Sequence, residues 1–263
     1  MSTPLSQLKI RQYLTTESLG QSLFLYPVTD STNLRAKLAA EEGASSGLCI
    51  IAEEQTAGRG RLGRSFLSPA QNGIYMSILL RPEAEIEQTV LITAATAVCV
   101  ARAIEQVAEC RVSIKWVNDL FIRQKKVCGI LTEAAVLPNS KKLSYAIVGI
   151  GINLSDDGIP EEIREIAGGI VPTGAPRPSR ERLIAEILNQ LEALLSDFRP
   201  ERFLSEYRDR SNLIGKSVSI IQNNIPIESG VAVDIDDDAR LVVRLDSGEL
   251  KHLSSGEISC RTE

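Results

Sequence analysis

The pattern of apolar and polar positions divides the first hundred residues between strands and helices. Short apolar runs bounded by turn-forming residues predict strands, whereas apolar positions three or four residues apart predict helices. On this basis we predict strands at 22–28, 48–54 and 73–81, and helices at 31–43 and 88–108.

The middle of the chain is dense in predicted strands. The apolar runs are RVSIKW, DLFIR, KVCGILTEAAV and SYAIVGIGINL, and turn-forming pairs such as Asn118-Asp119 separate them. Short connections of this kind favour antiparallel pairing. A proline-rich loop is predicted at 168–179, followed by an amphipathic helix at 179–198.

The pattern changes near Leu213. Four short strands, SVSII, GVAVDID, RLVVRLD and ELKHL, are broken by polar turns, as in a small β-barrel. We therefore predict two domains, 1–211 and 212–263, with the boundary near Ser211. The predicted fold class is α+β, with a mixed, largely antiparallel sheet covered by helices and a small C-terminal β-barrel.

Composition excludes several classes of function. Apolar residues make up 43% of the chain, and 29 basic against 34 acidic residues give a net charge of −5, which disfavours broad adhesion to nucleic acid. The apolar run from Thr89 to Ala101 is shorter than the roughly 20 residues of a membrane span. No signal peptide is recognisable and the five cysteines show no C-x-x-C pairing, so we expect a reduced, cytoplasmic location with no membrane attachment. The single histidine, His252, lies far along the chain from the motifs described below.

The stretch QTAGRGRLGRS, residues 55–65, concentrates Arg59, Arg61 and Arg64 among glycines. Glycines let backbone N–H groups point at an anion, and the forked donors of arginine suit carboxylate and phosphate oxygens. The alternative is a disordered basic loop or an RNA-adhesive segment. The stretch is not the G-x-x-x-x-G-K-[ST] phosphate loop, which disfavours a conventional nucleotide fold.

Two further motifs are candidates for chemistry. Lys126 opens an apolar strand, and half-buried lysines often pair with an anion; the alternative is a strand end whose lysine reaches water. GIGIN, from Gly149 to Asn153, ends another apolar strand, and glycine within a strand often marks the approach of a ligand; the alternative is a bulge.

In combination these motifs are specific. The order DSTN, EEQTAGRGRLGR, KWVNDL, KKVCGIL and GIGINLS, followed by a small β domain ending in GEISCR, resembles the biotin protein ligases, also called biotin–[acetyl-CoA carboxylase] ligases or holocarboxylase synthetases. The resemblance extends from about residue 22 to the C-terminus. It implies a core like that of class II synthetases and a C-terminal SH3-like β-barrel. Only about 21 residues precede the first predicted strand, so we expect the monofunctional type without a DNA-binding domain.

The family's chemistry implies the substrates and partners. Biotin and ATP, with Mg²⁺, would form biotinyl-5′-AMP, and a lysine of a biotin carboxyl carrier domain would then attack the acyl carbon. The protein would be a monomer or homodimer that binds no DNA. The metal ligands are not identified.

The resemblance also assigns residues. The catalytic residues it implies are Lys126, Arg61 and Asp119. The biotin-binding residues it implies are Ser31, Thr32, Asn33, Gln55, Arg59, Gly60, Arg61, Lys126, Gly129 and Gly149. The nucleotide-binding residues it implies are Arg59, Arg61, Asn118, Lys126, Asn153 and Arg261. Some relatives stack a tryptophan on the adenine, but the only tryptophan of this chain is Trp116, so we expect an aliphatic neighbour, with Ile170 as the candidate.

Two other functions remain open from the sequence. A lipoate or octanoyl transferase of the same fold could use Cys128 as a nucleophile beside Lys126. A non-catalytic protein that senses biotin or nucleotide would bind the same ligands without turnover. The arginine loop favours the ligase, because cofactor-free transacylation gives it no role.

Overall fold

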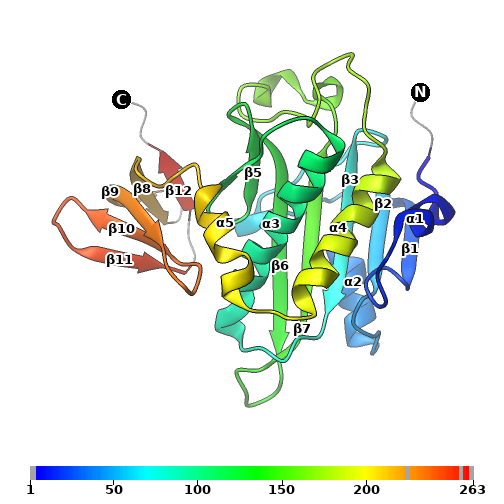
Figure 1. The fold of residues 1–263 in the computed structure, drawn as a ribbon, viewed down its shortest axis with the longest axis horizontal. Helices are drawn as coiled ribbons and strands as arrows, with labels where there is room; N and C mark the ends of the chain where they lie inside the picture. The colour runs from blue at the N-terminus through cyan, green and yellow to red at the C-terminus, as the bar shows by residue number, and fades with distance from the viewer. Residues whose placement is uncertain (1–3, 223–224, 255–256, 261–263) are drawn as a thin grey trace.

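The structure, a computed structural model, describes residues 4–222 and 225–254, together with the backbone of 257–260. A large sheet with helices on both faces forms the body of the molecule, and a small sheet lies at one side of it (Figure 1). This arrangement is the α+β class that the sequence predicts.

The large sheet has seven strands in the order β1-β2-β3-β7-β6-β5-β4. β1 and β2 are parallel, and every other neighbouring pair is antiparallel, so the prediction of a mixed, largely antiparallel sheet is confirmed. The strands are β1 (Leu23–Thr29), β2 (Cys49–Gln55), β3 (Gly73–Leu80), β4 (Ser113–Lys115), β5 (Asp119–Ile122), β6 (Lys125–Val136) and β7 (Leu143–Asn153).

Helices α3 and α4 cover one face of this sheet, and α2 lies against the opposite face (Figure 1). The helices are α1 (Gln7–Tyr13), α2 (Thr32–Glu41), α3 (Thr89–Val107), α4 (Arg180–Leu195) and α5 (Leu204–Asp209). The sequence pattern missed α1 and α5, which have seven and six residues. Helices this short depend on packing against the rest of the fold, so local propensity indicates them poorly.

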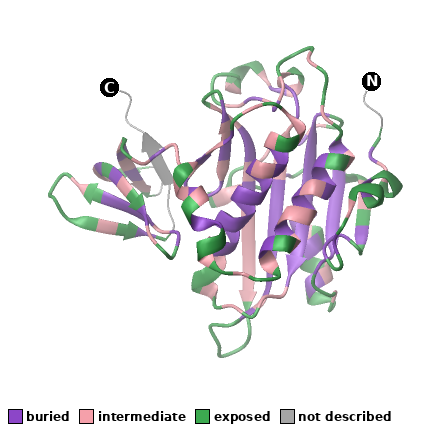
Figure 2. Ribbon diagram, viewed as in Figure 1, coloured by how far each residue is buried: buried purple, intermediate pink, exposed green. Residues whose placement is uncertain are grey.

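The core lies between the sheet and the two helices α3 and α4. All eight residues of β3 are buried, and Figure 2 shows the same for much of the central sheet. One segment, Ile86–Val107, is long and apolar enough to cross a membrane, but 72% of its apolar window is buried inside the protein. Its apolar surface is therefore used to form the core.

The small C-terminal sheet is antiparallel, in the order β11-β10-β9-β8-β12. It has five strands where the sequence pattern predicts four, so the predicted number was wrong. The fifth strand pairs with β8 and contains only four residues, too few for a clear alternation signal. The strands are β8 (Ser217–Gln222), β9 (Ile225–Ile235), β10 (Leu241–Leu245), β11 (Leu250–Leu253) and β12 (Glu257–Cys260).

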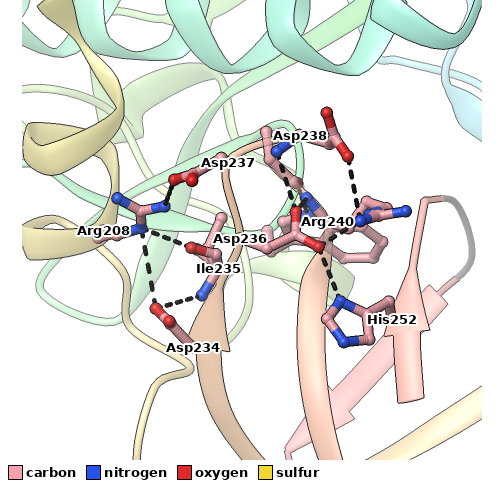
Figure 3. A network of polar contacts seen from close by, with 10 residues as sticks. Arg208, Asp234, Ile235, Asp236, Asp237, Asp238, Arg240 and His252 are labelled. Atoms are coloured by element: carbon pink, nitrogen blue, oxygen red, sulfur yellow. Dashed lines mark hydrogen bonds and ion pairs between the residues drawn. The ribbon is translucent and has the colours of Figure 1, made fainter. Parts of the chain in front are cut away.

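The turn between β9 and β10 contacts the large domain. Arg208 of α5 lies 2.7 Å from Asp237 and also donates to the carbonyl of Ile235 (Figure 3). The buried indole of Trp116 donates to the carbonyl of Ala239 at 2.9 Å. The small sheet is thus tied to the segment that directly precedes Asn118.

Candidate functional site

A narrow cavity of about 40 Å³ lies over the centre of the large sheet. Its floor comes from β6 and β7, and its walls come from the start of α2, the end of β2 and the arginine loop. The lining residues are Ser31, Thr32, Asn33, Gln55, Arg59, Phe66, Met76, Gly129, Ile130, Leu131, Gly149, Ile150 and Gly151. Seven of the ten residues that the sequence assigns to biotin therefore meet in one place.

The floor requires glycine because other groups approach the backbone there. Gly129 pairs with Gly151, and Leu131 pairs with Gly149, on adjacent strands. A Cβ on Gly149 would lie 2.0 Å from Asn33 Oδ1, and one on Gly151 would lie 2.6 Å from Phe66 Cε1. The motif GIGIN is therefore a site of close approach, and these glycines pair in register without a bulge.

A hydrogen-bonded network joins the first turn of α2 to the neighbouring strands. The side chain of Gln55 accepts bonds from the backbone N–H and the hydroxyl of Thr32, at 2.8 and 3.0 Å. Ser77 Oγ lies 2.7 Å from Thr32 Oγ1 and 2.6 Å from Asn33 Oδ1. Thr32, Asn33 and Ser77 are buried, and all four side chains are bonded to one another, so their directions are set by the fold.

Ser31, Thr32 and Asn33 are positioned by the start of α2. Ser31 is the N-cap residue, but its side chain makes no capping bond. Instead, the carboxylate of Asp30 accepts the N–H of Ser31 at 2.7 Å. This bond, partly opposed by desolvation, holds the pKa of Asp30 below its ordinary value. The hydroxyl of Ser31 thus lines the cavity without a role in capping.

The arginine loop is irregular but has a defined path. Phe66 N donates to Gly58 O at 2.9 Å, and Gly60 N donates to Arg64 O at 2.7 Å. Arg59 and Ser65 form an isolated β-bridge, so residues 59–65 make a small hairpin. Gly60 itself does not line the cavity. Because its arginines and glycines bury little apolar surface, we expect this loop to be mobile or irregular until ligand binds; its mobility stays a prediction.

Arg59 and Arg61 point to different partners. Arg59 Nη2 lies 3.0 Å from Glu133 Oε1 on β6. Arg61 Nη1 donates to Asn118 Oδ1 at 2.9 Å. Arg61 and Asn118 also line a second cavity of about 190 Å³, to which Ser254 of the small domain contributes.

Lys126 and Asp119 form an ion pair, with 2.7 Å between Nζ and Oδ1. β5 and β6 slip register by one residue at this point, and such a bulge turns a side chain toward the other face. Lys126 Nζ lies 3.3 Å from the position that a Cβ on Gly129 would occupy, so it reaches the glycine floor. Asp119 Oδ1 is shielded from solvent, and the ammonium group of Lys126 lies against it.

Asn118 is fixed by the sheet, whereas Asn153 lies apart from both cavities. The side chain of Asn118 is buried and donates to the carbonyl of Ile130 at 2.8 Å, while the N–H of Ile130 donates back to Asn118. Asn153 ends β7 and donates to Gly168 O at 3.2 Å. Ile170 is 2% exposed and belongs to the core. Arg261 lies outside the described residues.

Cys128 and His252 do not fit the role of nucleophile or base at this site. Cys128 is fully buried in the core, and desolvation raises the pKa of its thiol far above the ordinary value. His252 lies on β11, 2.7 Å from Asp236 in the small domain.

The sequence did not assign several residues that the structure brings to the site, among them Phe66, Ser77, Glu133 and Gly151. Gly151 stands two residues after Gly149, so the strand period places both on one face. Ser77 and Glu133 are polar residues within apolar strands, which is a signal of a buried partner. Phe66 carried no such signal.

Comparison with known proteins identifies relatives along nearly the whole chain. Residues 25–153 match the Biotin/lipoate A/B protein ligase family, and residues 213–261 match the Biotin protein ligase C terminal domain. The bifunctional ligase/repressor BirA of Bacillus subtilis is 33% identical over 97% of this chain and 78% of its own length. The biotin–[acetyl-CoA-carboxylase] ligase of Mycobacterium tuberculosis is 30% identical over 97% of this chain and 95% of its own length. A solved structure from Aquifex aeolicus, a biotin protein ligase in complex with biotin and ATP, is 30% identical, with a TM-score of 0.75 over 92% of this chain and all of that one.

Proposed function

Because the chain belongs to the biotin protein ligase family, we propose that it joins biotin to a lysine of a biotin carboxyl carrier domain of acetyl-CoA carboxylase at the expense of ATP. The observation that carries this proposal is the ion pair of Lys126 and Asp119 at the glycine floor, next in sequence to Asn118, which accepts a hydrogen bond from Arg61. The protein is a ligase, and biotin and ATP are its substrates.

The first step is the formation of biotinyl-5′-AMP. A carboxylate oxygen of biotin attacks the α-phosphorus of ATP, and the bond to the β-phosphate breaks to release diphosphate. Both reacting groups are anions, so the barrier contains their mutual repulsion. Cationic side chains held in place before the reaction lower that barrier without a nucleophile on the protein.

Lys126 and Arg61 supply that charge. Lys126 reaches the floor beside Gly129. In the proposed reaction its ammonium group contacts both the biotin carboxylate and the α-phosphate. Arg61 contacts the phosphate from the loop, next to Asn118. The resemblance assigns Asn118, Asn153 and Arg261 to the nucleotide; Asn118 lies beside Arg61 at the second cavity.

The pocket residues hold biotin. Ser31, Thr32, Asn33 and Gln55 present hydroxyl and amide groups that suit the ureido ring, while Gly129 and Gly149 let the ligand lie close to the sheet. The loop residues Arg59, Gly60 and Arg61 close over it. A site with this composition distinguishes biotin from its analogues by hydrogen bonding, because an analogue that lacks the ureido groups leaves buried polar atoms of the protein unpaired.

Mg²⁺ accompanies the nucleotide. Among the described residues, there is no group of three or more His, Cys, Asp or Glu side chains that could hold a metal ion. Mg²⁺ in nucleotide sites is commonly held by phosphates, waters and one or two carboxylates. Asp119, a carboxylate beside Lys126 at the floor, is the kind of group that fits that smaller part.

In the second step the carrier lysine attacks the acyl carbon of biotinyl-AMP. The bond between that carbon and the AMP oxygen breaks, the amide forms, and the amine loses a proton. Asp119 is the candidate base, since it lies beside Lys126 at the floor. Desolvation of the incoming lysine contributes by favouring its neutral form.

Intact-mass measurement tests the proposal. The protein is incubated with biotin, MgATP and a carrier domain, and the carrier should gain the mass of one biotinyl group. A carrier in which the acceptor lysine is replaced by arginine should stay unmodified. An unmodified wild-type carrier would refute the proposal.

The lipoate or octanoyl transferase is the less favoured function. Its cysteine nucleophile would have to be Cys128, which faces the core with a raised thiol pKa. Replacing biotin with lipoate or octanoyl-carrier in the same mass assay separates the two activities. A protein that only senses biotin or nucleotide would bind both ligands and leave the carrier unchanged.

We further propose a cytoplasmic enzyme, monomeric or homodimeric, that does not read DNA or attach to membranes. The net charge of −5 supports the absence of broad nucleic-acid binding. Binding to an operator fragment that resists salt would contradict it, and light scattering would report the oligomeric state.

A further inference from the structure

Glu133 is a charged residue in an apolar strand, on the same side of β6 as the glycine floor. It follows Gly129 and Leu131 at alternate positions, and alternate residues of a strand face one side of the sheet. It pairs in register with Ile147 of β7, and its side chain is 31% exposed. The chemistry proposed above gives this carboxylate no part.

Both carboxylate oxygens of Glu133 have partners, and the partners come from different elements. Oε1 lies 3.0 Å from Arg59 Nη2 on the arginine loop. Oε2 accepts a hydrogen bond from Asn33 Nδ2 at 2.8 Å. Asn33 is 5% exposed and bonded to Ser77, so it is a fixed point. Glu133 therefore ties the loop to the buried wall of the cavity.

Anchoring Arg59 also anchors Arg61. The β-bridge between Arg59 and Ser65 and the bond from Gly60 N to Arg64 O close the hairpin that carries Arg61. With the base of this hairpin held at Glu133, the side chain of Arg61 reaches Asn118 at the second cavity.

The ion pair with Arg59 determines how Glu133 affects a bound anion. A carboxylate beside a site for two anionic groups repels the ligand unless a cation neutralises it. Arg59 provides that cation for Glu133, so its charge is balanced within the protein. Arg61 donates to the side-chain oxygen of Asn118 at the second cavity.

From this arrangement, and resting on the proposed function, we infer that Glu133 is a positioning residue that holds the arginine loop closed through Arg59. Arg61, which the resemblance assigns to the phosphate, is carried by the same hairpin. The nucleotide role implied for Arg59 by the resemblance is thereby replaced by an anchoring role.

Two rates test the inference in the full-length protein. One is the release of biotinyl-AMP formed in place, and the other is tryptic cleavage after Arg61 and Arg64 without any ligand. Glu133→Gln removes the charge but can still accept from Asn33. Because exposed ion pairs contribute modestly, Glu133→Gln and Arg59→Ala should each raise both rates about two- to fivefold. The double variant should be no faster than the faster single variant, because both changes remove the same contact.

The matched control is Glu87→Gln, which removes an exposed carboxylate from a 3.0 Å pair with Lys141. It should leave both rates unchanged. Raised salt should speed tryptic cleavage of the wild type and have less effect on Glu133→Gln. A merely structural role would instead lower the melting temperature without this dependence on salt.

The result that overturns the inference is unchanged loop cleavage in Glu133→Gln, or additive effects in the double variant. Failure of the proposed function looks different: the wild type forms no biotinyl-AMP. The ligand-free cleavage rates still decide whether Glu133 anchors the loop in that case.

Discussion

Lys126 shows how one side chain can serve both the fold and the chemistry. Its ion pair with Asp119 joins two neighbouring strands, and its ammonium group lies at the glycine floor. The Lys126 and Asp119 side chains are 34% and 25% exposed, so the pair keeps some contact with solvent and contributes little to stability. The charge of Lys126 therefore matters most when two anions must be brought together.

Lys126→Ala should lower the rate of biotinyl-AMP formation by ~10²-fold or more, the scale of a lost electrostatic contact to a transition state. Single-turnover measurement with biotin and MgATP reports this rate. The control is Lys141→Ala, which removes an exposed lysine that is paired with Glu87. A normal single-turnover rate for Lys126→Ala would refute the role.

Cys128→Ser should leave carrier biotinylation intact, because the thiol is buried in the core and takes no part in the reaction. The new hydroxyl should lower the free energy of unfolding by about 1–3 kcal/mol, the cost of burying a polar group that lacks a partner. Activity is compared well below the melting temperature, where both proteins are folded. Loss of transfer in the folded variant would favour a cysteine nucleophile.

At the scale of elements, the site is formed where two antiparallel strands and one loop meet. β6 and β7 supply a floor of glycines, and the start of α2 projects Asn33 over Gly149. The loop closes the opposite side through Phe66. Its single glycines allow a tight path, and its arginines provide the charge.

Gly149→Ala should raise the KM for biotin at least tenfold, because the added Cβ would lie 2.0 Å from Asn33 Oδ1 and displace it. Overpacking of this kind also costs about 1–3 kcal/mol of stability. Gly151→Ala should raise the KM by less, because its Cβ would lie 2.6 Å from the edge of the Phe66 ring and that ring can turn away. Equal KM values for Gly149→Ala and wild type would contradict the close approach.

Arg61→Gly should leave adenylation partly active while letting biotinyl-AMP escape. The phosphate would lose its contact with the loop, and the closed loop would no longer retain the anhydride. The measurement is biotinylation of bystander lysines on an unrelated protein, with wild type as control. Tryptic cleavage of the wild-type loop should also slow when biotin and MgATP are added. Tight retention by Arg61→Gly, with a loop equally protected with and without ligand, would assign the arginines another function.

At the scale of the whole molecule, the small domain bears on the site through its β9–β10 turn. Asp236 builds this turn by accepting bonds from the backbone and side chain of Arg240 and pairing with His252 (Figure 3). The turn then receives the indole N–H of Trp116, two residues before Asn118. The placement of the small sheet and the direction of Asn118 thus depend on the same contacts.

Acidification should loosen this interface. Desolvation raises the pKa of Asp236, but hydrogen bonds from His252 and Arg240 outweigh it and hold the pKa below its ordinary value. A carboxylate whose folded pKa is depressed stabilises the fold above its unfolded pKa of about 3.9 and loses that contribution as pH falls through the folded pKa. The emission of Trp116, the only tryptophan, should shift to the red below about pH 4.

Asp236→Asn is the control for this titration. Its emission should already be shifted at neutral pH and should change less on acidification. A wild-type spectrum that stays constant down to pH values at which the protein unfolds would contradict the prediction.

Particular elements show how far the sequence leads. The long strands and α3 were predicted from continuous apolar runs, because these elements are buried on most sides. Helix α4 was predicted from apolar residues at helical spacing, because only one of its faces is buried. Helices α1 and α5 and strand β12 left no such trace, since a few residues stabilised by packing carry too little pattern. Arg59, Arg61, Lys126 and Asp119 were predicted as site residues from motif order, but their pairing partners were not.

The sequence by itself determined which residue types are available: arginines among glycines, a lysine at a strand start, glycines two apart in a strand, and no histidine near them. These features can be recognised in the sequence because they depend only on residue type and on the spacing of residues along the chain. Only the tertiary structure decided that Arg59 meets Glu133 while Arg61 meets Asn118, and that Cys128 faces the core. These contacts join residues up to 74 positions apart, 59 to 133. Sheet register and a one-residue bulge select them, because each decides which face a side chain takes.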